Sequence, residues 1–285
     1  MSSILTILRH TIQEALKRRL IHTGVLVSLL FLLLYGIAFA CLYGKATEQA
    51  ALRPANQIGL VVSSTLLSVL GLFAVHLMSG LLALFLTVGA ISGEIESGAM
   101  HAVLAHPIRR WQYLLGRWLG YVLLLCTYVT LMAGALLTIA GTIAGYEPLN
   151  AVAAVSTICL GAVSMLSLSL LGSARLSTLA NGIVCFTAFG AAWLSGIIEY
   201  VGNLMANEAL VNLGIIVSLI VPHDGIWRAA SFFAQSAAFL TAASFQVQLP
   251  FVASAPPAWA FLAWTVAHAV ACLAWAIHTF ESRDL

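Results

Sequence analysis

Long apolar runs separated by short polar stretches make up most of the chain. The runs cover residues 24–42, 58–92, 113–141, 151–172, 179–198 and 258–279. A helix needs about 20 apolar residues to cross the bilayer hydrocarbon, and each run is close to or above that length. The runs lack the alternation of polar and apolar residues that marks a membrane β-strand. The pattern therefore predicts an all-α integral membrane protein with six transmembrane helices.

The composition agrees with a membrane location. Hydrophobic residues make up 61% of the chain and charged residues 8%. Soluble domains carry about 25% charged residues, so a water-soluble class is excluded. The formal net charge of +2 is too small to indicate nucleic-acid binding. The cysteines stand singly, without CxxC spacing, and we interpret them as packing residues: Cys41, Cys126, Cys159, Cys185 and Cys272.

Residues 1–20 contain too many polar side chains to form the core of a signal peptide. Apolar residues such as Ile4, Leu8 and Ile12 recur at helical spacing, with His10 and Gln13 on the other side. This periodicity predicts an amphipathic helix in the membrane interface, followed by a single six-helix transmembrane domain over residues 21–285. A plain basic flank of the first span is the alternative.

The segment 199–258 mixes polar residues with an apolar run over 212–221 that is too short to cross a bilayer. Breaks are expected at Pro222 and Pro250. We predict short extracytoplasmic helices here, with Pro222, Asp224 and Arg228 as the residues of interest. The alternative is a seventh span over residues 230–249.

The distribution of basic residues predicts the orientation. Six spans place both termini on one side, and nine of the 12 lysines and arginines fall on that side. Basic residues favour the cytoplasm, so cytoplasmic N- and C-termini are expected. The nine are Arg9, Lys17, Arg18, Arg19, Arg109, Arg110, Arg117, Arg175 and Arg283, and the other three are Lys45, Arg53 and Arg228.

The stretch 93–117 is the long polar interruption in the first half of the chain. Ser97 is expected to cap a short helix over 97–105, and Pro107 to lie in the first turn of the third span. Arg109 and Arg110 would then lie at a helix N-terminus, where the dipole disfavours cations, so an acidic partner or a lipid phosphate is expected beside them. An ordinary cluster of cytoplasmic basic residues is the alternative.

Four segments carry a family resemblance. They are Gly-Glu-Ile-Glu-Ser-Gly at 93–98, Leu-Ala-His-Pro-Ile-Arg-Arg-Trp-Gln-Tyr-Leu-Leu-Gly-Arg at 104–117, Val-Pro-His-Asp-Gly-Ile-Trp-Arg at 221–228, and the terminal Arg-Asp-Leu. With them the chain resembles the permease subunits of type-2 ABC exporters, most closely the permease that serves maturation of nitrous oxide reductase. Val221 stands where members often have Asn, and Arg109 where a small residue is common.

The resemblance implies that residues of about 94–110 form a cytoplasmic coupling helix that docks on a separate ATPase. The chain would then be a permease subunit that moves substrate across the inner membrane of a bacterial cell, in a role in periplasmic metalloenzyme maturation. The coupling residues implied are Glu94, Glu96, Ser97, Met100, Val103, Leu104, Pro107, Arg109 and Arg110.

The resemblance also implies the partners, which are an ABC ATPase, a second permease copy in a homodimer, membrane lipids and a periplasmic accessory protein. No Gly-x-x-x-x-Gly-Lys-Ser/Thr loop occurs in the sequence, so nothing in this chain would cradle ATP phosphates. We expect no cofactor, no catalysis and no nucleic acid on this chain, with ATP and magnesium bound by the partner.

Two other function classes remain open, a structural membrane anchor and a membrane redox, haem or metal-binding enzyme subunit. His268 and His278 are about 15 Å apart along a helix, too far to hold one haem together. His76 is the candidate metal ligand within a span, although a hydrogen-bonded interhelical histidine is the more common case. Glu94 and Glu96 do not share a helix face, which argues against a catalytic carboxylate pair.

Overall fold

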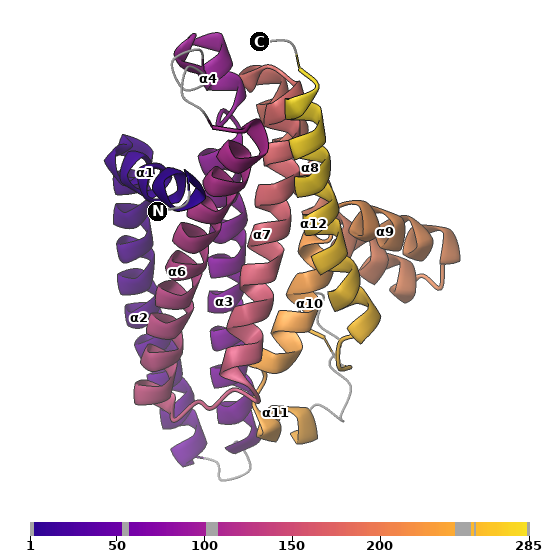
Figure 1. Cartoon of the computed structure of the whole chain (residues 1–285). Helices are drawn as coiled ribbons and strands as arrows, with labels where there is room; N and C mark the ends of the chain where they lie inside the picture. The colour runs from indigo at the N-terminus through magenta and orange to yellow at the C-terminus, as the bar shows by residue number, and fades with distance from the viewer. Residues whose placement is uncertain (1–2, 53–56, 101–107, 243–251, 254, 284–285) are drawn as a thin grey trace.

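The computed structural model describes residues 3–52, 57–100, 108–242, 252–253 and 255–283. Within these ranges, six helices are long and apolar enough to cross a membrane, which confirms the predicted all-α architecture. Both chain ends lie at the same end of the bundle (Figure 1). The helices that carry the spans are α2 (Arg19–Leu52), α3 (Gln57–Thr87), α6 (Arg110–Ala144), α7 (Ala151–Arg175), α8 (Thr178–Leu204) and α12 (Trp259–Glu281).

Helices α2 and α6 are longer than the apolar runs that predict them, with 34 and 35 residues. At 1.5 Å per residue each is roughly 50 Å long, well above the thickness of the hydrocarbon. Polar residues such as Lys45 and Glu48 end an apolar run but not a helix, because helical hydrogen bonds continue into water. Helix α6 ends only at Gly145, which adopts a left-handed conformation with φ 60°.

Helix α1 (Ser3–Lys17) packs across the start of α6. Its protein-facing side consists of Ile7, Thr11 and Ala15, all buried. Ile7 lies over Gly116 of α6 and Thr11 over Gly120, and a Cβ on Gly116 would stand 2.8 Å from Ile7 Cβ. This is the small-xxx-small arrangement that lets two helix backbones approach closely.

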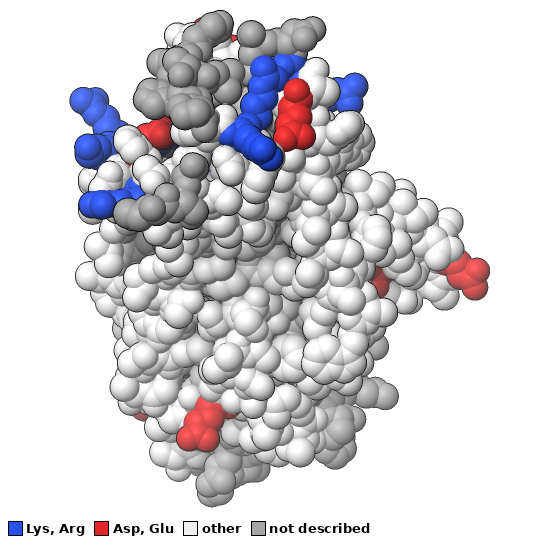
Figure 2. Space-filling view, in the orientation of Figure 1, with Lys and Arg blue, Asp and Glu red and all other residues white. Residues whose placement is uncertain are grey.

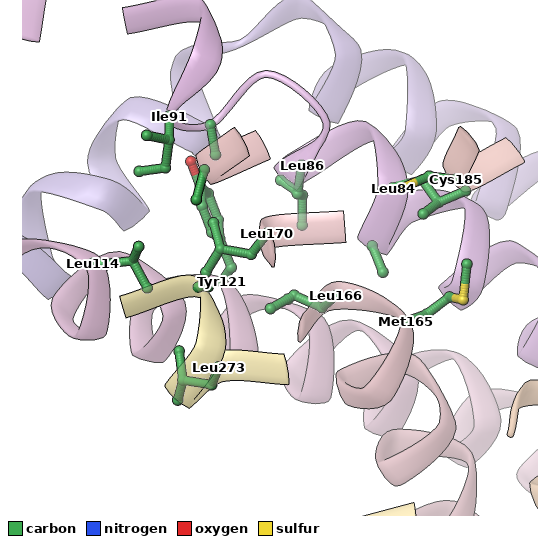
Figure 3. Packing of buried hydrophobic residues seen from close by; sticks show 14 of the residues in the cluster. Leu84, Leu86, Ile91, Leu114, Tyr121, Met165, Leu166, Leu170, Cys185 and Leu273 are labelled. Atoms are coloured by element: carbon green, nitrogen blue, oxygen red, sulfur yellow. The ribbon is translucent and has the colours of Figure 1, made fainter. Parts of the chain in front are cut away.

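Helix α7 lies at the centre of the bundle, in contact with α3, α6, α10 and α12. Figure 3 shows the core at one end of this helix, where Leu166 and Leu170 of α7 meet Leu114 of α6 and Leu273 of α12. The indole Nε1 of Trp118 donates to Ser167 Oγ at 2.9 Å, so a serine in this span bonds a neighbouring helix.

The described residues of the segment before the last span form three short helices, α9 (Glu208–Ile220), α10 (His223–Ala234) and α11 (Ala237–Ala242). Helices α9 and α10 meet at an angle of 94°. Figure 1 shows α9 projecting from the side of the bundle, whereas α10 packs among the spans against α7. In the described part of 230–249, helix α10 ends at Ala234 and α11 is separate, so no continuous seventh span is present there.

The close contact of α1 with α6 generates a stability prediction. Gly116→Ala should destabilise the protein by about 1–3 kcal/mol, because the added methyl group overpacks a contact that includes the Ile4 backbone oxygen at 3.1 Å. Gly134→Ala is the matched control on the same helix, since no atom lies within 4 Å of a Cβ there. It should be neutral or stabilising by up to about 1 kcal/mol. Thermal unfolding in detergent measures both, and equal shifts would contradict the packing.

Candidate functional site

Helix α4 (Ser92–Glu96) stands at the end of the bundle that carries the two termini (Figure 1). Its start is held by α7, because Ser173 Oγ accepts hydrogen bonds from the backbone N–H groups of Ile91 at 3.0 Å and Ser92 at 3.2 Å. Both donors would otherwise be unsatisfied at the helix N-terminus. A serine of the central span therefore fixes where α4 begins.

Arg117 of α6 fixes the middle of α4. Its guanidinium is only 4% exposed and pairs with Glu94 of α4 and with Glu14 of α1, the latter at 3.0 Å. Arg117 also donates to the hydroxyl oxygens of Tyr113 at 2.9 Å and Tyr121 at 2.8 Å. The Tyr113 hydroxyl in turn donates to Glu94. A charge that cannot be neutralised by deprotonation is thus balanced by two carboxylates from two other elements.

Glu96 fixes the end of α4. Its carboxylate Oε1 accepts from the backbone N–H of Thr178, the first residue of α8, at 2.9 Å. A negative charge is stabilising at a helix N-terminus, where the N–H groups are free and the dipole is positive. Through Ser173, Glu94 and Glu96, helix α4 is bound to α7, α6 and α8.

The described part of the predicted coupling stretch differs in one detail from the expectation. Ser97 is the C-cap of α4, and its hydroxyl donates back to the Glu94 carbonyl oxygen at 3.3 Å, so it does not begin the next helix. Gly98, with φ 75°, separates the two segments instead. Met100 is buried in the core of this chain, with 1% exposure. Val103, Leu104 and Pro107 lie outside the described residues.

The two arginines at the start of α6 have different surroundings. Arg109 is the N-cap residue and is exposed. Arg110 donates through Nη1 to the backbone oxygens of Phe280 at 3.3 Å, Glu281 at 3.3 Å and Arg283 at 2.5 Å. A cation on the final carbonyl groups of α12 is favourable. Arg110 therefore binds the end of the last span, whereas the Arg109 side chain has no ion-pair partner in the part of the chain that the structure describes.

A second polar cluster lies inside the bundle, around the start of α10. Arg228 of α10 pairs with Glu199 of α8 at 2.6 Å and with Asp224, one turn earlier, at 3.4 Å. Pro222 is the N-cap residue of α10. Ionisable residues within a membrane domain are costly and mark sites of function by default. The ion pair thus brings together two of the residues predicted from the sequence, Asp224 and Arg228.

His76 lies beside this cluster and contacts His223 of α10. Among the described residues, no group of three or more histidine, cysteine, aspartate or glutamate side chains is placed to hold a metal ion. The predicted metal role of His76 therefore has no ligand set in the described structure.

Sequence reasoning did not find the Arg117 pairings. Tyr113, Arg117 and Tyr121 recur every four residues and so share one face of α6, which is a readable signal for a polar patch on a buried helix. Glu14 could not be assigned to that patch, because it lies on an amphipathic helix whose position depends on the glycines at 116 and 120. The pairing of distant helices is not encoded in helical periodicity.

The bundle of six apolar helices, with its polar groups gathered at one end and around one internal bend, defines a multi-pass α-helical membrane protein. The chain belongs to the ABC-2 family of transporter proteins, whose family model matches residues 5–285. It is similar to the probable ABC transporter permease protein NosY of Pseudomonas aeruginosa, with 36% identity over 126 residues, 44% of this chain and 41% of that protein.

NosY of Stutzerimonas stutzeri is also similar, with 33% identity over 149 residues, 52% of this chain and 49% of that protein. The aligned stretches thus span about half or less of the length of these curated relatives.

The Arg117 cluster generates a second prediction. Arg117→Met should destabilise the α1–α4–α6 contact by about 1–3 kcal/mol, because it leaves the Glu94 carboxylate without its cation in a site that is 19% exposed. Adding Glu94→Gln should recover part of the loss, because the uncompensated charge is removed. Thermal unfolding and the rate of proteolysis in residues 3–17 measure the loss of stability in Arg117→Met and its partial recovery in the double variant.

The control is Arg109→Met, which removes an exposed cation at the start of the same helix. If the double variant is no more stable than Arg117→Met alone, charge balance is not what holds the cluster together.

Proposed function

We propose that this chain is the membrane-spanning subunit of an ABC exporter, driven by ATP that a separate ATPase hydrolyses. The observation that carries the proposal is the attachment of α4 to α6, α7 and α8 through Ser173, Glu94 and Glu96. Because this short helix is bonded to three spans, a displacement caused by a bound partner would be transmitted to the membrane domain.

The charge on the surface supports an ATPase contact at this end. Figure 2 shows the lysines and arginines of the visible face gathered at the end that carries α1, α4 and the C-terminus. Basic residues favour the cytoplasmic side of a bacterial inner membrane, and ATP is a cytoplasmic substrate. On this basis both termini are cytoplasmic and residues 94–110 face the ATPase.

Contacts within this chain narrow the set of residues that we propose to touch the ATPase. Glu94 and Arg110 are engaged within this chain, and Met100 is buried in its core. Ile108, Arg109, Arg110, Trp111 and Glu281 line a shallow hollow at the same end. We therefore assign Glu94, Glu96, Met100 and Arg110 to holding the contact segment in place. Arg109 and the apolar residues at 103–104 would make the contact itself.

Several finer features of the function belong to the same proposal. A functional transporter would contain two permease copies and two ATPases, with no catalytic group on the permease and lipids around it. The subgroup resemblance favours a role in maturation of a periplasmic metalloenzyme, with an accessory protein on that side. Haem or flavin absorbance in the purified chain would instead identify a redox enzyme, and indifference to ATP a structural anchor.

The proposal predicts two separable contributions to ATPase binding. Leu104→Asp should remove association, because the apolar burial of a leucine contributes about 1.5–3 kcal/mol and a carboxylate in its place would be left unpaired. Arg109→Ala should weaken binding by only about 0–1 kcal/mol, in a salt-dependent way, because an exposed ion pair is screened. Co-purification with the partner ATPase, at low and high salt, measures both.

Leu149→Asp is the matched control, because Leu149 is an exposed leucine in the turn between α6 and α7, at the other end of the bundle. It should leave ATPase binding unchanged. A Leu104→Asp permease that inserts normally and binds the ATPase with full affinity would refute the assignment of this stretch.

A further inference from the structure

Two histidines stack face to face inside the membrane domain. His76 lies in α3 and His223 is the first residue of α10, and their ring centroids are 4.0 Å apart with an interplanar angle of 17°. Both residues are buried, with 1% and 2% exposure. The pair lies where the chain bends by 94° between α9 and α10, so it joins that bend to helix α3.

The hydrogen bonds of the pair are incomplete. His76 Nε2 lies 3.1 Å from the backbone oxygen of His223, and because a carbonyl oxygen only accepts, Nε2 is the donor. Nδ1 of His76 then carries an unused lone pair. Neither ring nitrogen of His223 makes a hydrogen bond of full geometry among the described residues, and the backbone of Gly161 is the polar group that interacts with this ring. Burying a polar atom without a hydrogen-bond partner is costly, so the retention of these histidines calls for a reason.

The space around the rings excludes ligands of ordinary size. Trp227 and Phe189 pack against the two imidazoles, with ring centroids 5.5 Å from His76 and 5.0 Å from His223. Gly80 and Gly161 close the cage, since a Cβ on Gly80 would lie 2.7 Å from His223 Cε1. Stacked rings also point their lone pairs side by side rather than toward one point, which does not suit a metal ion. The ligand that fits the arrangement is a proton.

We propose that His76 and His223 form a proton-binding pair: while both rings are neutral, the start of α10 stays docked on α3, and protonation of either ring releases it. An imidazolium in this apolar cage loses its hydration without gaining a free counter-charge. The pair can therefore accept a proton readily only after it separates. Protonation and docking compete.

The groups on the neighbouring elements support this competition. On α8, Glu199 is paired with Arg228, which also holds Asp224. On α12, His268 is engaged with Ser164 Oγ of α7 at 2.9 Å and lies near Cys272. On α7, Cys159 packs against the core that contains Trp227. Helix α9 has one ionisable residue, the exposed Glu208, and α3 has only His76. No unpaired carboxylate of the described residues meets the rings.

The far end of α10 is anchored, so release would be a swing about that end. Asn150 N–H donates to the Phe233 carbonyl oxygen at 3.0 Å, and the Tyr146 hydroxyl donates to Ala234. The hydroxyls of Thr65 and Ser236 lie 2.9 Å apart. The first turns of α10 meet α3 through ring contacts, namely the histidine pair and Trp227 on Phe73 at a centroid distance of 5.1 Å. Pro222 removes a backbone donor at the bend.

The sign of the pH dependence follows from the buried neutral state. Docking is favoured at high pH and is lost as the pH falls, because the released histidines bind protons that the docked pair does not. With an ordinary histidine pKa of about 6.5 after release, one proton raises the ratio of released to docked molecules up to about 30-fold between pH 8 and pH 5. The proposal adds a proton-controlled position of α10 to the transport function and does not require the ATPase.

The test uses the full-length permease in detergent, with its five native cysteines replaced. Nitroxide labels are attached through Leu70→Cys on α3 and Ile220→Cys at the end of α9, both exposed positions. Pulsed electron paramagnetic resonance then gives the distance distribution at pH 8 and at pH 5. We expect one population at pH 8 and a second, longer one at pH 5. His76→Gln with His223→Phe should hold the pH 8 distribution at both pH values, because the two side chains fill the site with groups that cannot titrate.

His268→Gln is the control, a substitution of another membrane histidine that should shift with pH as the native chain does. A native chain with the same distances at both pH values would overturn the proposal, whatever the variants do. A distance distribution that changes with pH in the His76→Gln, His223→Phe variant as it does in the native chain would also overturn it, since Asp224 and Glu199 would then be the groups that titrate. Loss of ATPase binding in a separate pull-down would bear on the transport proposal alone.

Discussion

The buried guanidinium of Arg117 places the strongest constraint on the end of the bundle that carries the two termini. A permanent charge removed from water must have nearly all its donors occupied by charged or strongly polar partners. The chain meets this requirement with Glu14 from α1, Glu94 from α4, and Tyr113 and Tyr121 from the same helix as the arginine. Three separate elements are thereby placed at one point, and none of them can move far without exposing an unpaired charge.

The position of α4 illustrates the consequence. A helix of five residues has little stability of its own, because nucleating a helical turn costs more entropy than one hydrogen bond returns. Its place is set from outside, by Ser173 at its start, Glu94 in its middle and Glu96 at its end. These bonds tie the position of α4 to the positions of α6, α7 and α8, and the proposed coupling to an ATPase relies on this connection.

The parts of this account that the sequence predicts are those set by local pattern. Run length and composition were sufficient for six helices, and the polar stretch at 93–117 marked the end of the bundle where α4 stands. The pairing of Arg117 with Glu14, or of His76 with His223, could not be derived, because periodicity says which residues share a helix face but not which face lies opposite. The misplaced cap at Ser97 has a local cause, since Gly98 supplies the left-handed turn that separates two helical segments.

The central claim is that α1, α4 and the start of α6 form one unit that lies against the ATPase. Electron cryomicroscopy of the permease with its ATPase, without nucleotide and with a non-hydrolysable ATP analogue, tests it most directly. The account predicts ATPase density against residues 94–110 in both states. It also predicts that α1, α4 and the start of α6 shift together with the Arg117 pairings to Glu14 and Glu94 intact. ATPase density elsewhere, or an α4 that moves while α1 and α6 stay in place, would contradict it.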